Sequence, residues 1–187
     1  VSQELFIVRR EAKREMLHKL LLQYHGAVLV FSRTKHGARK IARELKGRGH
    51  RAIDIHSDRT LAQRRDALEG FRSGKYRILV ATDIAARGLD VKGIEVVVNF
   101  DLPDEIGNYV HRIGRTGRAG YTGHAITLAT PEEGREIQKI ARLIRKQLKV
   151  SSHPEFPVEK FSFNPFAPAR LVGRWEQHVR GRIRRRG

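Results

Sequence analysis

The sequence predicts an α/β protein in which a parallel β-sheet is flanked by helices on both faces. Five short runs rich in valine, isoleucine and leucine indicate buried strands, because strands covered on both faces read as nearly continuous apolar segments. Segments with helical periodicity separate these runs, and such alternation is typical of parallel sheets. The length of 187 residues and a hydrophobic content of 40% suffice for one well-buried domain, with some chain left over.

The predicted elements follow one another in a regular order. A first strand, ELFIV at 4–8, is predicted at an edge of the sheet, and an amphipathic helix follows at 11–24. The buried strands are the apolar runs 27–31, 51–55, 77–81, 95–100 and 124–129. Further helices are predicted at 34–49, 59–74, 103–116 and 131–148. The last of them opens on Pro131, a residue that a first helical turn tolerates.

The composition changes near Ser151. Four of the six prolines and five of the thirteen aromatic residues lie in 151–187, and from Arg170 onward there are seven arginines against Glu176 alone. We therefore expect one domain at 1–150 and a basic tail, not a continued sheet, at 151–187. Such a tail is either a solvated, disordered end or an electrostatic arm that binds phosphates, and the basic balance of the whole chain favours the arm.

The charge balance points to a polyanionic partner. Lysine and arginine number 38 against 20 acids, and the resulting net charge of +18 most often indicates a nucleic-acid partner. The absence of cysteine excludes disulfides and thiolate metal sites and fits a reducing compartment, so we expect a cytoplasmic protein without a membrane segment. Because the chain starts at Val1 and its only methionine is Met16, we expect it to be a piece of a longer protein.

Two glycine-rich stretches look like phosphate-binding motifs but do not satisfy them. GFRSGKY at 70–76 is one residue short of a P-loop between its glycines and has Tyr76 where Mg²⁺ needs serine or threonine. It also lies between a helix and a strand, the reverse of the order that aims backbone amides at a phosphate. GRTGRAG at 114–120 lacks the GxG of a dinucleotide fingerprint. We therefore expect no phosphate cradle in this chain.

The stretch HRIGRTGRAG at 111–120 indicates an external anion. Arg112, Arg115 and Arg118 are three residues apart, and the glycines between them keep the backbone free of bulk. Like charges at this spacing repel one another on an ordinary helix surface. In doubly wound sheets ligands bind beyond the carboxyl ends of the strands, where we expect this stretch to meet FSRTK (31–35) and ATDIAARGLD (81–90).

The segment ATDIAARGLD offers several kinds of polar group. Thr82 and Asp83 supply a hydroxyl and a carboxylate, Arg87 a guanidinium, and Gly88 an accessible backbone N–H. Asp90 suits a ribose diol, because a carboxylate accepts hydrogen bonds from two hydroxyls but repels phosphate.

Taken together and in this order, FSRTK, ATDIAARGLD, VVNFDLP and HRIGRTGRAG resemble motifs IV, V, Va and VI of DEAD-box RNA helicases. The resemblance covers residues 1–150 and implies the second of two RecA-like domains. It also implies an enzyme that closes both domains around ATP and RNA and separates a short duplex locally. The family's Walker A lysine, its Mg²⁺-binding carboxylates and its adenine-reading motif belong to the first domain and do not occur here.

The resemblance assigns the nucleotide-binding residues one by one. Arg115 and Arg118 match the arginines that reach the γ-phosphate, with Arg118 as the finger, a contact that can contribute roughly 10³ to 10⁵ in rate. Asp90 matches the ribose contact, and Gly88 belongs to the same turn.

The resemblance also assigns interdomain and RNA-binding residues. Arg87, His111 and Arg112 are expected at the interface between the domains, where they tie motif VI to other motifs. The expected RNA-binding residues hold the sugar-phosphate backbone and are Ser32, Arg33, Thr34, Arg64, Thr82 and Asp83. The family often shows histidine-glycine-aspartate where this chain has His56, Ser57 and Asp58, and Leu61 replaces a glutamine. Arg64 is therefore either an RNA contact or part of a solvated helix face.

The sequence thus predicts the second half of an ATP-dependent RNA helicase, inactive without its N-terminal ATP-binding domain. The alternative is a stand-alone basic module that binds or anneals RNA. ATP with Mg²⁺ is expected to be held mainly by the absent domain, and the expected partners are RNA and the N-terminal RecA-like domain of the same protein. The nine histidines show no paired spacing typical of zinc ligands, so no metal site is predicted in this chain.

Overall fold

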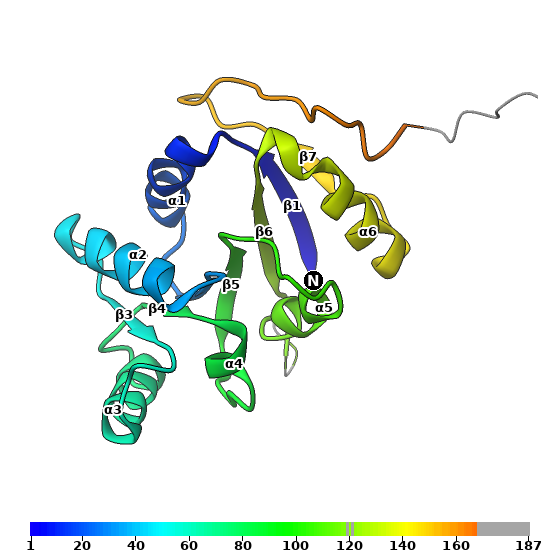
Figure 1. Ribbon diagram of the computed structural model, residues 1–187. Coiled ribbons are helices and arrows are strands. Elements are labelled where there is room, and N and C mark those ends of the chain that lie inside the picture. Colours follow the sequence, from blue (N-terminus) through cyan, green and yellow to red (C-terminus); the bar gives the residue numbers. More distant parts are fainter. Residues whose placement is uncertain (119, 121, 168–187) are drawn as a thin grey trace, which may run out of the picture.

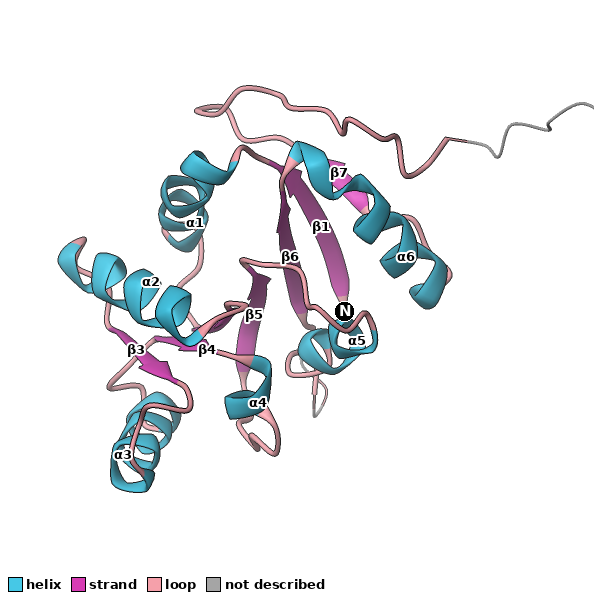
Figure 2. Ribbon diagram, in the orientation of Figure 1, coloured by secondary structure: helices cyan, strands magenta, loops and turns pink. Residues whose placement is uncertain are grey.

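A single seven-stranded, all-parallel sheet organises the chain, as the computed structural model shows for residues 1–118, 120 and 122–167 (Figures 1 and 2). The strands, in the spatial order β3-β4-β2-β5-β6-β1-β7, are β1 (Ser2–Ile7), β2 (Ala27–Phe31), β3 (Ala52–Ile55), β4 (Ile78–Ala81), β5 (Ile94–Asn99), β6 (His124–Ala129) and β7 (Lys149–Ser151). The predicted parallel α/β fold is confirmed.

Six helices connect the strands, and none of those described is long and apolar enough to cross a membrane. They are α1 (Lys13–Leu21), α2 (Lys35–Gly47), α3 (Leu61–Arg72), α4 (Asp83–Ala86), α5 (Gly107–Ile113) and α6 (Gly134–Ile144). Short 3-10 turns, η1 (Arg10–Ala12) and η2 (Pro131–Glu133), lead into α1 and α6.

The position predicted for the first strand is wrong. The strand β1 pairs with β6 on one side and with β7 on the other, so that Leu5 lies between Thr127 and Val150. The sheet therefore does not stop at 150 but extends through Ser151. The physical reason is the open edge that β1 would otherwise present, since unpaired strand edges expose backbone hydrogen-bonding groups.

Two helices also differ from the predicted ones. The helix expected at 103–116 is confined to Gly107–Ile113, because the preceding loop is held against the sheet by the buried Leu102 and by an ion pair between Asp104 Oδ1 and Arg33 Nε at 3.2 Å. In addition, the segment after β4 contains the single-turn helix α4.

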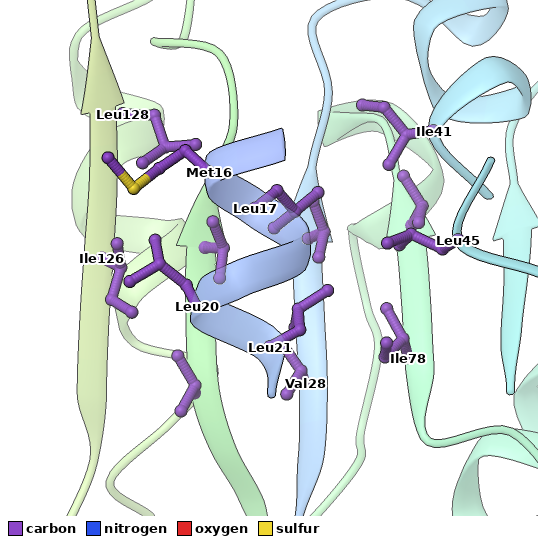
Figure 3. Close-up of a cluster of buried hydrophobic side chains, with 14 of the residues drawn as sticks. Met16, Leu17, Leu20, Leu21, Val28, Ile41, Leu45, Ile78, Ile126 and Leu128 are labelled. Carbon is purple, nitrogen blue, oxygen red and sulfur yellow. The ribbon is translucent and has the colours of Figure 1, made fainter. Parts of the chain in front are cut away.

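Hydrophobic layers cover both faces of the sheet. Helices α1 and α2 lie on one face and pack against alternate residues of the central strands; Figure 3 labels Met16, Leu17, Leu20, Leu21, Val28, Ile41, Leu45, Ile78, Ile126 and Leu128. On the other face, Phe71 of α3 packs with Leu29 and Leu79, while Tyr109 of α5 packs with Ile137 and Ile140 of α6. Each fully buried side chain of this size contributes about 1.5 to 3 kcal/mol to folding.

Residues 152–167, which we call the strap, pack against the domain. Phe156 contacts the core on the α1 face, whereas Phe161 and Phe166 join the cluster around Tyr109 on the opposite face. The strap crosses between the faces at the carboxyl ends of the strands, above α1 and then α6 (Figure 1), where the Ser162 backbone N–H donates to a carbonyl of η2. The expected arm from Arg170 onward lies outside the described residues.

Candidate nucleotide and nucleic-acid site

Adjacent strands place two of the predicted segments side by side. Because β4, β2 and β5 are neighbours, FSRTK at the end of β2 lies next to Thr82 after β4. The Ser32 side chain is buried, and its Oγ lies 3.4 Å from Oδ2 of Asp101, which also accepts from the Arg33 backbone N–H at 2.9 Å. Asp101 thereby fixes the backbone of FSRTK, and Thr34 caps α2 by accepting from the Gly37 N–H at 3.0 Å.

Arg112 is buried, with 1% of its surface exposed, and binds the loops together. Its Nε and Nη2 donate to the two carboxylate oxygens of Asp83 at 2.6 and 2.7 Å. Its Nη1 donates to the Asp101 carbonyl at 2.6 Å and to Asn99 Oδ1 at 3.3 Å, and its guanidinium carbon lies 4.9 Å from the centre of the Phe31 ring. This bidentate geometry is the strong form of an arginine–carboxylate pair. Arg112 thus ties α5 to Asp83 of ATDIAARGLD within this domain, and its expected part in the interface between the domains stays a prediction.

The arginine turn, residues 114–118, lies away from the carboxyl ends of the strands. The Thr116 hydroxyl donates to the Ile94 carbonyl at 2.6 Å, which holds the turn at the amino end of β5. The expectation that the whole arginine stretch meets FSRTK at the carboxyl edge is therefore wrong for Arg115 and Arg118. Helix α5 starts near the carboxyl ends of the strands and runs back across the sheet, so the arginine turn that follows it lies away from FSRTK.

The predicted ribose-binding turn lies beside the arginine turn. Arg115 Nη1 donates to the Leu89 carbonyl at 2.8 Å, and Arg72 Nη2 donates to the Asp90 carbonyl at 3.2 Å. Gly88 has a φ of 73°, which favours glycine, and the Asp90 residue is exposed. The structure therefore brings Gly88, Asp90 and Arg115 together.

Arg118 is exposed at the end of the turn, where its Nε donates to the Gly114 carbonyl at 2.6 Å. Burial, followed by the proximity of Arg118, lowers the pKa of Arg115. Both guanidinium groups remain charged at any physiological pH, because arginine does not lose its proton in proteins. Two cations held this close favour a multivalent anion between them.

A hollow of about 40 Å³ separates α4 from α5, with Arg87 and His111 exposed at its rim. A pocket that encloses a small ligand normally measures about 300 to 1,000 Å³. This hollow alone is too small for a nucleotide, so the rim residues need a second surface to complete a site.

A charged network supports the FSRTK segment from the α1 side. The buried Lys13 Nζ donates to the Phe100 carbonyl at 2.9 Å and lies 3.8 Å from carboxylate oxygens of both Asp101 and Glu133. Burial lowers the pKa of Lys13, and the two carboxylates oppose that shift. Arg33 pairs with Asp104 at 3.2 Å and with Glu133 at 3.7 Å, but its side chain is 45% exposed and can still be reached by an anion.

The loop after β3 is held by a buried histidine. His56 Nδ1 accepts from the Asp58 backbone N–H at 3.2 Å, so its Nε2 carries the proton and donates to Asp54 Oδ2 at 2.7 Å. Burial would raise the pKa of Asp54, but hydrogen bonds from Arg59 and His56 together lower it. Arg64 lies one turn further along, in the first turns of α3, and is only partly exposed.

Sequence reasoning missed the residues that support the site. Four polar residues contact a predicted site residue or its loop: Asn99, Asp101, Lys13 and Asp54. All of these contacts join residues distant in sequence, except the local pair between Asp54 and His56. A polar residue at the end of an apolar run, as Asn99 is in EVVVNF, was the available signal.

Comparison with known proteins identifies the family. The helicase conserved C-terminal domain family matches residues 12–120. The DEAD-box ATP-dependent RNA helicase CshA of Geobacillus kaustophilus is 42% identical over 155 residues, which are 82% of this chain and 33% of that protein. The chain thus spans about a third of the length of this relative.

Solved structures agree with this assignment. The E. coli DEAD-box protein SrmB, in complex with regulator of ribonuclease activity A, superimposes with a TM-score of 0.81 at 30% identity, covering 87% of this chain and 97% of that one. Dbp5 of S. cerevisiae, bound to RNA and ADP BeF3, gives a TM-score of 0.75 at 30% identity over 81% of this chain and 41% of Dbp5. The chain therefore belongs to the DEAD-box RNA helicase family, of which it represents the helicase C-terminal, RecA-like domain.

Proposed function

We propose that this chain is the second half of an ATP-dependent RNA helicase, in which it supplies cations to ATP and a backbone-binding surface to RNA. The arginine turn carries this proposal. Arg115 contacts the turn that carries an accessible carboxylate, Asp90, and Arg118 is exposed at the end of the arginine turn, yet the hollow beside Arg115, of about 40 Å³, cannot enclose a nucleotide. The site therefore needs a phosphate cradle on a second surface, which we assign to the N-terminal RecA-like domain of the same protein.

In the closed state, Arg118 would act as the arginine finger. Phosphoryl transfer spreads negative charge over the γ-phosphate oxygens, and a guanidinium delivered across an interface stabilises that charge. Arg118 is exposed and donates to the Gly114 carbonyl, its one hydrogen-bond partner among the described residues, so it can exchange this hydrogen bond for a phosphate. Arg115 orients the turn through Leu89 and adds a second positive charge, while Asp90 accepts from the ribose hydroxyls.

The interface between the domains would form around α4 and α5. Arg87 and His111 are exposed at the rim of the hollow between these helices, where a second domain can reach them. Arg112 transmits their position inward, because its guanidinium joins α5 to Asp83 at the start of α4.

RNA would bind along the carboxyl ends of β2, β3 and β4. Ser32, Arg33 and Thr34 lie on the loop after β2, with Arg64 at the start of α3 in the next connection. Thr82 precedes α4, but its hydroxyl makes no capping hydrogen bond, so it is available to a phosphate oxygen. Asp83 contributes through Arg112, which occupies both of its carboxylate oxygens. These groups recognise phosphate and sugar, and binding should be largely independent of base sequence.

Mg²⁺ would accompany ATP and not this chain. The described residues bring together no group of three or more histidine, aspartate or glutamate side chains that could hold a metal ion. We therefore assign the metal ligands to the N-terminal domain and to the phosphates.

We also expect the protein to act in the cytoplasm.

The second candidate is a stand-alone basic module that binds or anneals RNA. The net charge of +18 favours RNA binding in either case. ATP turnover distinguishes the two. As the helicase half, the purified chain should bind RNA but hydrolyse no ATP, and joining it to an N-terminal ATP-binding domain should give RNA-stimulated hydrolysis. Joined protein that binds RNA without hydrolysing ATP would favour the stand-alone module.

The RNA surface itself is tested by Thr82→Ala. Because the Thr82 hydroxyl makes no capping bond, its removal should leave the unfolding midpoint unchanged while weakening RNA binding about tenfold. The matched control is Ser73→Ala, which removes a hydroxyl that donates to the Gly70 carbonyl at the carboxyl end of α3 and should leave RNA affinity unchanged. Equal RNA affinity for wild type and Thr82→Ala would remove Thr82 from the site.

A further inference from the structure

The outer surface of α6 and the start of β7 carry an uncompensated positive patch. Between residues 137 and 154 the chain has no acid, and its five cations are all exposed: Lys139, Arg142, Arg145, Lys146 and Lys149, which we call the α6 patch. All ion pairs among the described residues involve other cations. A dense group of unpaired cations repels itself and is relieved by a bound anion.

The patch lines a groove and not a flat helix face. A cavity of about 410 Å³ lies between the end of α6 and the strap, with Arg142, Arg145 and Lys146 on one wall and Pro165, Phe166 and Ala167 on the other. Gln138 holds the strap wall through a hydrogen bond from its Nε2 to the Pro165 carbonyl at 3.5 Å, and Phe166 is anchored in the cluster around Tyr109. The cations therefore face a defined opening.

Arg145 occupies a backbone position that costs stability. It has a φ of 53° and a ψ of 35°, and it is the only non-glycine residue with positive φ in the described part of the chain. It ends α6 in a Schellman arrangement, in which the Lys146 N–H donates to the Ala141 carbonyl at 3.1 Å. Glycine is the unstrained choice there. An arginine kept at a strained position points to a use for its side chain.

The α6 patch is separate from the RNA surface described above. Helix α6 leaves the carboxyl end of β6 and returns the chain to the amino end of β7, so its last turn lies at the amino edge of the sheet. Thr82 and FSRTK lie at the carboxyl edge, on strands near the other end of the sheet. Figure 1 shows α6 beside β1, with α3 at the far side of the molecule and α4 between α3 and α5. One short RNA segment cannot occupy both surfaces.

We propose that the α6 patch is a second RNA-binding surface, which holds the phosphates of RNA extending beyond the helicase site; this rests on the proposed function in RNA binding. Lys139 and Arg142 lie about one helical turn apart on α6, a rise of about 4.5 Å, and Lys146, just beyond the end of the helix, lines the groove together with Arg142, so the three can contact successive phosphates of one strand. Such contacts carry no base specificity. The described part of the strap ends at Ala167, which lines the groove.

The first test compares two charge-matched variants of the chain. K139Q/R142Q/K146Q removes three patch charges, and K40Q/R43Q/K46Q removes three exposed cations of α2 on the opposite face. RNA affinity is measured by fluorescence anisotropy at several salt concentrations, with RNAs of about 6 and about 30 nucleotides.

The patch variant should bind the longer RNA about 10- to 100-fold more weakly and lower the slope of log affinity against log salt by about 2, while the short RNA changes little. Equal losses in the two variants would overturn the proposal, because net charge alone would then explain them. Thr82→Ala is the separate check on the proposed function, and it should weaken the binding of both RNAs. If Thr82→Ala has no effect while the patch variant has its full effect, the helicase site is contradicted and the α6 patch is not.

The second test uses Arg145→Gly, whose two effects have opposite signs. Relief of the positive φ should raise the unfolding midpoint by about 2 to 4 °C, while loss of the guanidinium weakens binding of the longer RNA. A variant that is more stable and binds that RNA as well as wild type would overturn a role for Arg145. Poly-glutamate of matched charge is the competitor: if it displaces the longer RNA from the patch as effectively as unlabelled RNA does, the surface is one for acidic proteins and the proposal of RNA is wrong.

Discussion

Removal of the Arg112 side chain should break the link between the segments that follow β4 and β5. In Arg112→Ala, the carboxylate of Asp83 loses both bidentate donors, and the Asp101 carbonyl and Asn99 Oδ1 lose theirs. Breaking a buried arginine–carboxylate pair costs about 3 to 5 kcal/mol, because the remaining charge stays uncompensated. Arg112 is 1% exposed, but the Asp83 side chain that keeps its charge is 23% exposed, so the lower end of this range applies and the unfolding midpoint should fall by roughly 6 to 12 °C.

The measurement is urea unfolding of wild type and variant, with an unchanged m-value showing that the same folded core is compared. Arg118→Ala is the matched control: Arg118 is exposed, so its removal should change the free energy of unfolding by about 0.5 kcal/mol or less. In a double-mutant cycle with Asp83→Ala, the coupling between the two side chains should be about 1 to 3 kcal/mol. A loss below about 1 kcal/mol for Arg112→Ala, or additive effects in the cycle, would refute the role given to this residue.

Three further outcomes follow from other parts of the structure. Burial lowers the pKa of both His18 and His50, so the unfolded chain binds protons before the folded one as the pH falls. The free energy of unfolding should therefore be level above about pH 6.5 and decrease below it, and His18→Gln should flatten that decrease. The same pH profile in wild type and variant would contradict a role for His18. In Gly134→Ala, the new Cβ overlaps the Phe163 carbonyl of the strap, which should cost about 1 to 3 kcal/mol by urea unfolding, and an unaffected midpoint would show that the strap is not packed as described. Deleting residues 170–187 should weaken binding of unrelated RNAs alike and flatten the salt dependence; identical slopes with and without the arm would leave RNA binding to the loops alone.

The buried strands were predictable from sequence because both faces of this sheet are covered. Val28, Leu79 and Val97 are fully buried. Strands covered on both faces are apolar at nearly every position, so each appears in the sequence as a continuous apolar run. The strand β7 was not predictable in the same way, since only KVS pairs with β1 and two of its three residues are exposed. Its existence depends on the open edge of β1, a tertiary feature.

The site was predictable in its motifs but not in its geometry. Local motifs named Asp83, Arg112 and Arg115, yet only the fold shows that Arg112 is buried against Asp83 from a position 29 residues away. Lys13 contacts the Phe100 carbonyl across 87 residues, and no local pattern marks it. Long-range polar pairs of this kind depend on sheet order, which local sequence does not encode.

The most direct test of the central claim measures RNA-stimulated ATP hydrolysis by the helicase that carries this chain together with its N-terminal ATP-binding domain. Arg118→Ala is compared with wild type and with Arg43→Ala, an exposed arginine of α2 far from the site. If Arg118 is the finger, its loss should lower kcat by roughly 10³-fold or more while the dissociation constant for ATP changes by about threefold or less, because the contact forms only in the transition state. The Arg43→Ala variant should match wild type. An unchanged kcat in Arg118→Ala, with folding and RNA binding intact, would contradict the claim that this domain completes the catalytic site.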